Sequence, residues 1–279
     1  MTVRVDAHHH VWRLSRGDYG WLQPTEALAP IYRDFELQEL RPLLAAQSVE
    51  ATVLVQAAPT EAETRFLLDV AERSGGLVRG VVGWVDFESA SAIDALAALA
   101  RNPLLRSVRP MLQDLDDAGW IARPDPQRTL AALPQLGVRF DALVKPRNLP
   151  ALLRALEHHV EVEAVIDHCA KPDIAQKDWQ PWADDLAAIG RHTSAHCKLS
   201  GLVTEAGANW TVDALRPYVD HVLECFGPQR VMWGSDWPVA TLAASYAAWS
   251  AATDALLAGL SSGEQEAIRG GNAQRFYRL

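Results

Sequence analysis

The sequence predicts a (β/α)₈ barrel that forms one domain over all 279 residues. Two observations lead to this fold. Short segments typical of strands alternate with longer segments of helical spacing, eight times in succession. This alternation indicates a parallel sheet with helical crossovers, and eight strands can close into a barrel whose interior is filled by side chains. No change in composition marks a second domain.

An open, doubly wound sheet is the alternative fold for the same alternation of strands and helices. That fold normally has a glycine-rich phosphate-binding loop directly after its first strand. Here the first strand ends in three histidines, His8–His10, and the chain contains neither a G-x-G-x-x-G nor a Walker A pattern. The histidines are embedded in strand-forming residues, so we interpret them as native rather than as a purification tag. We therefore predict the barrel.

The elements follow one another in order along the chain. The predicted strands are Thr2–His10, Ala51–Gln56, Val78–Val85, Leu105–Val108, Val138–Val144, Val162–Asp167, His196–Ser200 and the run Val231–Trp233. The predicted helices are Phe35–Gln47, Glu61–Ser74 with Thr60 as its N-cap, Ser89–Arg101, Gln127–Leu136, Leu149–His159, Trp182–His192, Val212–Phe226, Leu242–Leu257 and a closing helix from about Glu264.

Two long connections interrupt this alternation, Val11–Tyr32 and Met111–Pro126. Both contain tryptophan, and the second also contains several acidic residues. Long irregular segments inside compact domains are usually lids or pocket walls. We expect these two connections to determine substrate specificity, although the sequence does not predict their conformations.

Composition narrows the class of protein. The formal net charge of −9 and the absence of a basic run argue against binding to nucleic acid or to an anionic membrane surface. No stretch approaches the ~20 apolar residues of a membrane span, and the N-terminus lacks the apolar region of a signal peptide. The three cysteines have no CxxC spacing, which argues against a disulfide framework or a thiolate zinc site. We therefore expect a cytoplasmic protein.

Polar residues recur where the predicted strands end, and in a barrel these ends surround the active site. They are His8, His10, Gln56, Trp84, Asp86, Arg109, Asp141, His168, Lys171, Lys198, Ser200, Asp236 and Trp237. His8 and His10 share one face of a strand, with Cα atoms about 6.5–7 Å apart. Two imidazoles at this spacing can bind the same ion.

A candidate metal site follows from the positions of four of these residues. His8 and His10 end the first predicted strand, His168 the sixth and Asp236 the eighth, so the barrel brings them into one ring. Three imidazoles and a carboxylate suit zinc or a similar divalent ion. Individually, each has an ordinary alternative; Asp236, for example, could simply form a turn before Pro238.

Five motifs strengthen this interpretation. They are Asp6-Ala-His-His-His10-Val-Trp12, Arg109-Pro-Met-Leu-Gln113, Val165-Ile-Asp-His-Cys-Ala-Lys-Pro172, Cys197-Lys-Leu-Ser-Gly-Leu202 and Trp233-Gly-Ser-Asp-Trp-Pro-Val239. Together they resemble the amidohydrolase superfamily and, more narrowly, its sugar-lactonase branch of L-fuconolactonase-like and L-rhamnonolactonase-like proteins. The resemblance extends over essentially the whole chain and implies a small-molecule substrate, a sugar lactone.

The resemblance also implies roles for individual residues. Asp236 would be the base that activates water, and His168 and Lys198 would help to stabilise the oxyanion. Arg109 and Lys171 would bind polar substrate groups, and Trp237 would offer an apolar face to the sugar ring. Each has an ordinary alternative, since Arg109 could pair with an aspartate, Lys171 could lie in solvent and tryptophan is common in barrel packing.

The sequence departs from binuclear members of the superfamily, whose metals are bridged by a lysine of strand four or a histidine of strand five. Those positions here offer Arg109 and Asp141. We therefore expect at most one divalent ion, with zinc as the best match, and leave open whether activity requires it. Two other functions stay open, a metal-dependent decarboxylase of an unsaturated or aromatic acid and an inactive barrel that acts as a binding protein.

Overall fold

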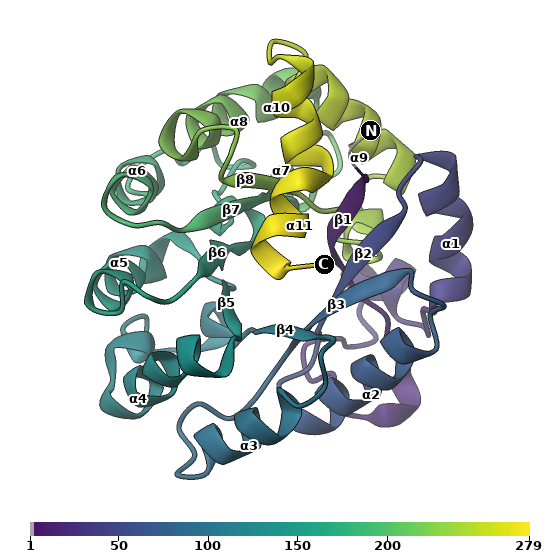
Figure 1. Cartoon of the computed structure of the whole chain (residues 1–279). Helices are drawn as coiled ribbons and strands as arrows, with labels where there is room; N and C mark the ends of the chain where they lie inside the picture. The colour runs from purple at the N-terminus through teal and green to yellow at the C-terminus, as the bar shows by residue number, and fades with distance from the viewer. Residues whose placement is uncertain (1–2) are drawn as a thin grey trace.

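The computed structural model describes residues 3–279, and within this range eight parallel strands follow one another around a barrel in the order of the sequence (Figure 1). The strands are β1 (Val5–His9), β2 (Ala51–Val55), β3 (Val78–Gly83), β4 (Leu105–Val108), β5 (Arg139–Ala142), β6 (Ala164–Ile166), β7 (His196–Leu199) and β8 (Val231–Trp233). The predicted barrel is confirmed. Thr2, the predicted start of the first strand, lies outside the described residues.

Helices cover the outside of the barrel, as Figure 1 shows. They are α1 (Leu37–Ala46), α2 (Glu61–Glu72), α3 (Ala92–Leu99), α4 (Pro124–Ala132), α5 (Leu149–His158), α6 (Trp182–His192), α8 (Val212–Phe226) and α9 (Tyr246–Leu256), with a short α7 (Leu202–Ala206) after β7. The predicted N-cap of α2 is confirmed, because the Thr60 side chain accepts a hydrogen bond from the Glu63 amide. No helix in the described part of the chain is long and apolar enough to cross a membrane.

Several predicted boundaries were wrong. Six strands end one or two residues earlier than predicted. The predicted last residues that already belong to the loops above the barrel are His10, Gln56, Val85, Val144, Asp167 and Ser200. Helix α4 begins at Pro124, three residues before the predicted start at Gln127, since proline is favoured in the first turn of a helix.

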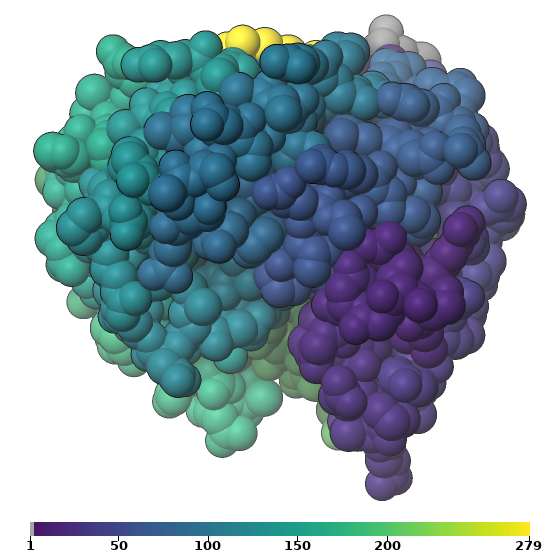
Figure 2. Space-filling view, turned by 90° about the horizontal axis from the view of Figure 1, so that it is seen from below, coloured from purple at the N-terminus to yellow at the C-terminus, as the bar shows by residue number. Residues whose placement is uncertain are grey.

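Both long connections contain more regular structure than the sequence predicted. Short 3-10 helices occur at Leu14–Arg16 and Glu26–Ile31 in the first connection and at Leu112–Asp114 and Trp120–Ala122 in the second. In Figure 2 the purple N-terminal segment projects at the end of the molecule opposite the yellow C-terminal helix. The loops thus build up one end of the barrel.

The C-terminal segment covers the other end of the barrel. The predicted closing helix consists of α10 (Ser262–Glu266), a π-helical turn and α11 (Asn272–Tyr277), and it lies across the barrel mouth in Figure 1. Phe276 and Tyr277 pack against the valines of the barrel interior. The polar strand ends therefore face the opposite mouth, where the loops lie.

Candidate active site

The first and last strands meet at the seam of the barrel, where their ends approach one another closely. His9 and Trp237 form a parallel bridge, and the His10 amide donates to the Trp237 carbonyl at 2.7 Å. A Cβ atom on Gly234 would lie 2.6 Å from the Cβ of His8, so only glycine allows this approach. The buried Asp6 carboxylate accepts the Ser235 amide at 2.8 Å and thereby holds the two strand ends together.

The seam places His8, His10 and Asp236 against one another. His8 Nε2 and His10 Nε2 are 3.2 Å apart, and Asp236 Oδ1 lies 3.8 Å from the former and 3.4 Å from the latter. His9 lies between the other two histidines on the opposite face of the strand and forms a hydrogen bond with Thr52 Oγ1 at 2.9 Å. The H-x-H motif thus brings two imidazoles to one carboxylate.

His168 reaches the same carboxylate from an unusual turn after β6. Four successive non-glycine residues, His168 to Lys171, have φ between 51° and 60°, and Asp236 has φ 56°. This left-handed conformation costs energy in such residues and is often found at active sites. The His168 ring packs against Gly201 and bonds Ser200 Oγ through Nδ1 at 2.8 Å, while its Nε2 lies 3.9 Å from Asp236 Oδ1.

These groups could hold a metal ion. The ligand atoms of His8, His10 and Asp236 lie within 4.8 Å of one another, and those of His8, Asp167 and His168 form a second such group. The His10 Nδ1 atom is 2.8 Å from the Val55 carbonyl and must donate to it, so Nε2 carries the lone pair that a metal ligand requires. Three of the four predicted ligands, His8, His10 and Asp236, form one group. The fourth, His168, lies next to this group at Asp236.

Burial and neighbouring charges set the protonation of the two central groups. Burial opposes ionisation of Asp236, but the facing His168 and His10 outweigh it and hold the pKa of the carboxyl below its ordinary value. Burial lowers the pKa of His168 to about 4, although Asp236 opposes this shift. At neutral pH the site therefore contains a carboxylate beside a neutral imidazole.

A charged layer lies beneath these groups, inside the barrel. Lys198 Nζ is 2.5 Å from Asp141 Oδ2, 3.0 Å from Asp167 Oδ1 and 3.2 Å from His8 Nδ1, and all four residues are fully buried. Tyr277, from the C-terminal helix, donates to Asp141 at 2.7 Å. Lys198 was predicted to stabilise an oxyanion on the substrate. Its position is different, because two aspartates surround its ammonium group below the site.

Arg109 lies at the boundary between this layer and the cavity. Its Nη1 atom is 3.1 Å from Asp167 Oδ2 and 3.4 Å from His8 Nε2, and its other terminal nitrogen donates to the Gln56 carbonyl. It forms the aspartate pair that was its ordinary alternative, yet it also lines the cavity.

The cavity above Asp236 has a volume of about 240 Å³. His10, His168 and Lys171 line it together with Arg109, and Lys171 pairs with Glu205 at 3.6 Å. Trp237 was predicted to face the substrate, and it is not among the residues that line this cavity. Its ring is buried and packs edge-to-face on Phe35, with ring centroids 5.3 Å apart, and its carbonyl accepts a hydrogen bond from the His10 amide.

Several residues at the site escaped the sequence analysis. Trp21, Met111, Gln113 and Asp114 come from the two long connections and line the cavity, so the predicted role of these connections as pocket walls agrees with their position. Asp167 pairs with Arg109 and Lys198 but was interpreted only as the end of a strand. Its position directly before His168 was the one feature of the sequence that could have indicated a role at the site.

The fold and the site define a class of protein, a (β/α)₈ barrel with imidazoles and a carboxylate that converge at its strand ends. The chain belongs to the Amidohydrolase family, which matches residues 5–279.

Characterised relatives are similar over nearly their whole length. The chain is 45% identical to the L-fucono-1,5-lactonase of Burkholderia ambifaria, with 100% of this chain and 97% of that protein covered. It is 35% identical to the L-fucono-1,5-lactonase of Burkholderia multivorans, again with 100% and 97% covered. A crystal structure of a Burkholderia multivorans amidohydrolase with bound zinc superposes with a TM-score of 0.93 at 35% identity and covers 99% of both chains.

Proposed function

We propose that this protein hydrolyses a sugar-acid lactone of the L-fucono-1,5-lactone type. The observation that carries the proposal is the Asp236 carboxylate, which faces a small cavity among three imidazoles in a chain 45% identical to an L-fucono-1,5-lactonase. A cavity of about 240 Å³ is below the range of about 300–1,000 Å³ for drug-sized ligands and suits a single small ring.

Asp236 acts as the general base. Opening a cyclic ester requires that water lose a proton as it attacks the carbonyl carbon, and a positioned carboxylate accelerates this transfer. The pKa of Asp236 is below its ordinary value, so the group is ionised at neutral pH. Its left-handed backbone and the seam contacts fix its direction, which reduces the reorganisation needed at the moment of reaction.

Arg109 and His168 handle the charge that develops on the substrate. The Arg109 guanidinium lines the cavity beside His8 and offers N–H donors to the carbonyl oxygen as it becomes negative. When Ser200 donates to His168 Nδ1, the proton of the neutral imidazole lies on Nε2, which faces Asp236. This N–H is placed to hydrogen-bond the leaving ring oxygen. Lys171, also on the cavity wall, binds a substrate hydroxyl.

The donor set fits one divalent ion, with zinc as the best match. Tetrahedral ligands with bonds of about 2.0–2.1 Å lie roughly 3.3 Å apart, and the spacings among His8, His10 and Asp236 are 3.2, 3.4 and 3.8 Å. His168 would complete the set only in the other tautomer, in which Nδ1 donates to Ser200 and Nε2 carries the lone pair. Zinc bound there would polarise the carbonyl and lower the pKa of water. Arg109 lies 3.4 Å from His8 Nε2 and would oppose a cation, which favours a single and dispensable ion.

The two alternative functions have less support. The relative that is 45% identical over the whole chain is a lactonase and not a decarboxylase. A binding protein without activity has no need of an ionised, buried Asp236 held in a strained conformation beside three imidazoles.

A pH-indicator screen of aldonolactones tests the proposal. We expect acid release from L-fucono-1,5-lactone or a close stereoisomer, and a much slower release in the Asp236→Asn variant. Release of carbon dioxide from an aromatic acid would point to the decarboxylase, and inactivity toward the whole panel would contradict the proposal.

A further inference from the structure

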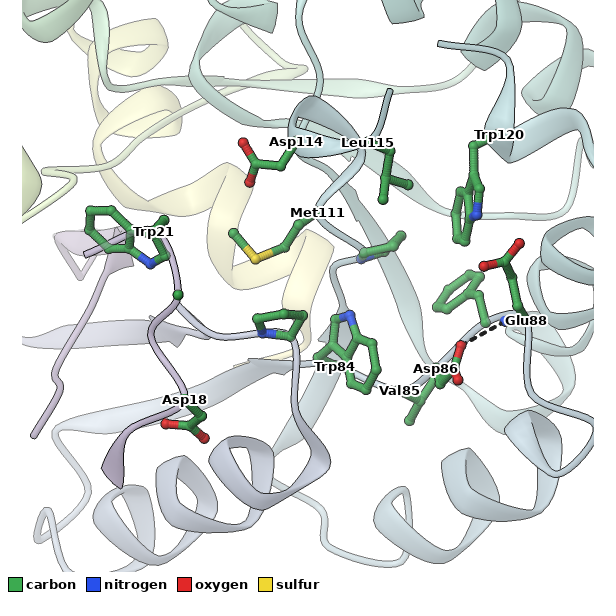
Figure 3. Close-up of a pocket in the computed structure, with 14 residues that line it drawn as sticks. Asp18, Trp21, Trp84, Val85, Asp86, Glu88, Met111, Asp114, Leu115 and Trp120 are labelled. Carbon is green, nitrogen blue, oxygen red and sulfur yellow. Dashed lines mark hydrogen bonds between the residues drawn. The ribbon is translucent and has the colours of Figure 1, made fainter. Parts of the chain in front are cut away.

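A second cavity adjoins the catalytic one and plays no part in the chemistry above. Its volume is about 570 Å³, more than twice that of the catalytic cavity. Trp21, Met111 and Asp114 line both, so the two share a wall and one molecule can extend from one into the other. Figure 3 shows these three residues on one side of the second cavity and Trp84 and Trp120 toward the other.

Aromatic side chains form part of the wall of this cavity. Trp84 follows β3, Phe87 lies on the same loop, and Trp120 comes from the second long connection. Trp84 was predicted to end a strand at the active site, and the structure places it in this cavity instead of in the one above Asp236. Flat aromatic faces bury the apolar side of a ring and leave its edge free for hydrogen bonds.

The polar groups of the wall are carboxylates, and no lysine, arginine or histidine lines the cavity among residues 3–279. An anionic substituent is therefore disfavoured. Asp18 pairs with Arg16 at 2.7 Å and Glu88 with Arg123 at 3.4 Å, so part of the negative charge is already balanced. The carboxylates thus serve as acceptors for hydroxyl donors rather than as a site for an organic cation.

We propose that the second cavity is a subsite for a neutral sugar ring attached through a glycosidic bond to the lactone. The proposal rests on the proposed function and extends its substrate class from monosaccharide to disaccharide lactones. The second ring packs on Trp84 and Trp120, and its hydroxyls donate to the carboxylates. Lactone opening adds water across the ring ester and leaves the glycosidic bond intact, so the product is a glycosylated sugar acid.

The test compares L-fucono-1,5-lactone with its mono-O-glucosylated derivatives at O2, O3 and O4. We expect at least one derivative to exceed the plain lactone in kcat/KM by about tenfold, and Trp84→Ala to remove this advantage. Trp84→Phe should retain most of it, and the control Trp179→Ala, at a half-exposed tryptophan outside both cavities, should leave both substrates unchanged. The proposal is overturned if no derivative exceeds the plain lactone, or if Trp84→Ala leaves the ratio unaltered.

A binding measurement separates this proposal from the proposed function. If the plain lactone is not hydrolysed, the proposed function fails, and calorimetry with the ring-opened acids then decides about the cavity. Tighter binding of a glucosylated acid than of L-fuconate by about tenfold, lost in Trp84→Ala, would support the subsite. Equal affinities of the two acids would reject it.

Discussion

The strand-end residues divide into two layers that differ in chemistry. His10, His168 and Asp236 face the cavity, and their mutual contacts are 3.4 Å or longer. Lys198 and Asp141 lie below them, in contact at 2.5 Å and without access to the cavity. The upper groups are free to accept a ligand or an ion, whereas the lower charges already neutralise one another. A polar residue at a strand end of a barrel is therefore not by itself a substrate contact.

The first test of this comparison is Asp236→Asn, for which we expect the largest effect on activity. Loss of the base should lower kcat about 10²–10⁴-fold, the usual contribution of general-base catalysis. Because Asp236 has no lysine or arginine partner within 4.0 Å among residues 3–279, the free energy of unfolding should change much less. Steady-state kinetics and urea unfolding measure the two effects. If the variant unfolds more readily but keeps its kcat, Asp236 has a structural role like that of the residues in the lower layer.

The second test concerns the lower layer, where stability should suffer. Lys198→Met leaves Asp141 and Asp167 buried with fewer cationic partners. Breaking a buried ion pair costs about 3–5 kcal/mol, so urea unfolding should show a loss of this size or a failure to fold. Lys177→Met, at an exposed position, is the matched control. If stability is unchanged and kcat falls strongly, Lys198 instead has the catalytic role that the sequence predicted.

His168 allows a test by pH, in chelator-treated protein. Its pKa is lowered by burial from 6.5 to about 4. Above pH 6.5 the imidazole is neutral in both the native and the unfolded state, so stability has its full value. Between pH 6.5 and 4 the unfolded chain binds a proton that the native state does not, and stability falls by up to about 3 kcal/mol.

Replacing His168 by Gln should flatten this part of the stability profile, while His192→Gln, at an exposed position, should not. The measurement is the urea unfolding free energy at several pH values. A profile that is equally steep in His168→Gln would show that other histidines account for the fall.

Metal removal should have a smaller effect than loss of Asp236. An ester carbonyl is electrophilic, and Arg109 already places a positive charge at the cavity wall. We expect at most one divalent ion per chain by elemental analysis, and chelation should lower kcat less than Asp236→Asn does. An equal loss would make the ion essential, and two ions per chain would contradict the coordination proposed here.

The sequence predicted the barrel and the meeting of His8, His10, His168 and Asp236 because strand order alone brings these positions together. It could not assign residues to a layer. Lys198 lies inside β7, whereas Asp236 lies three residues beyond the end of β8, and strand lengths were predicted too imprecisely to separate these cases. The aromatic wall of the second cavity was also beyond prediction, because it depends on loop conformations.

Arg109 belongs to both layers and therefore tests where the boundary lies. Arg109→Met removes a cavity donor, so KM should rise about tenfold and more than kcat falls, as expected for a contact similar in the ground and transition states. Stability should fall less than in Lys198→Met, because Asp167 keeps Lys198 at 3.0 Å. Arg109→Lys retains the charge but not the planar fork and should restore only part of the affinity. If KM for the best lactone stays unchanged while stability falls, Arg109 is a structural partner of Asp167, and the upper layer begins at His10.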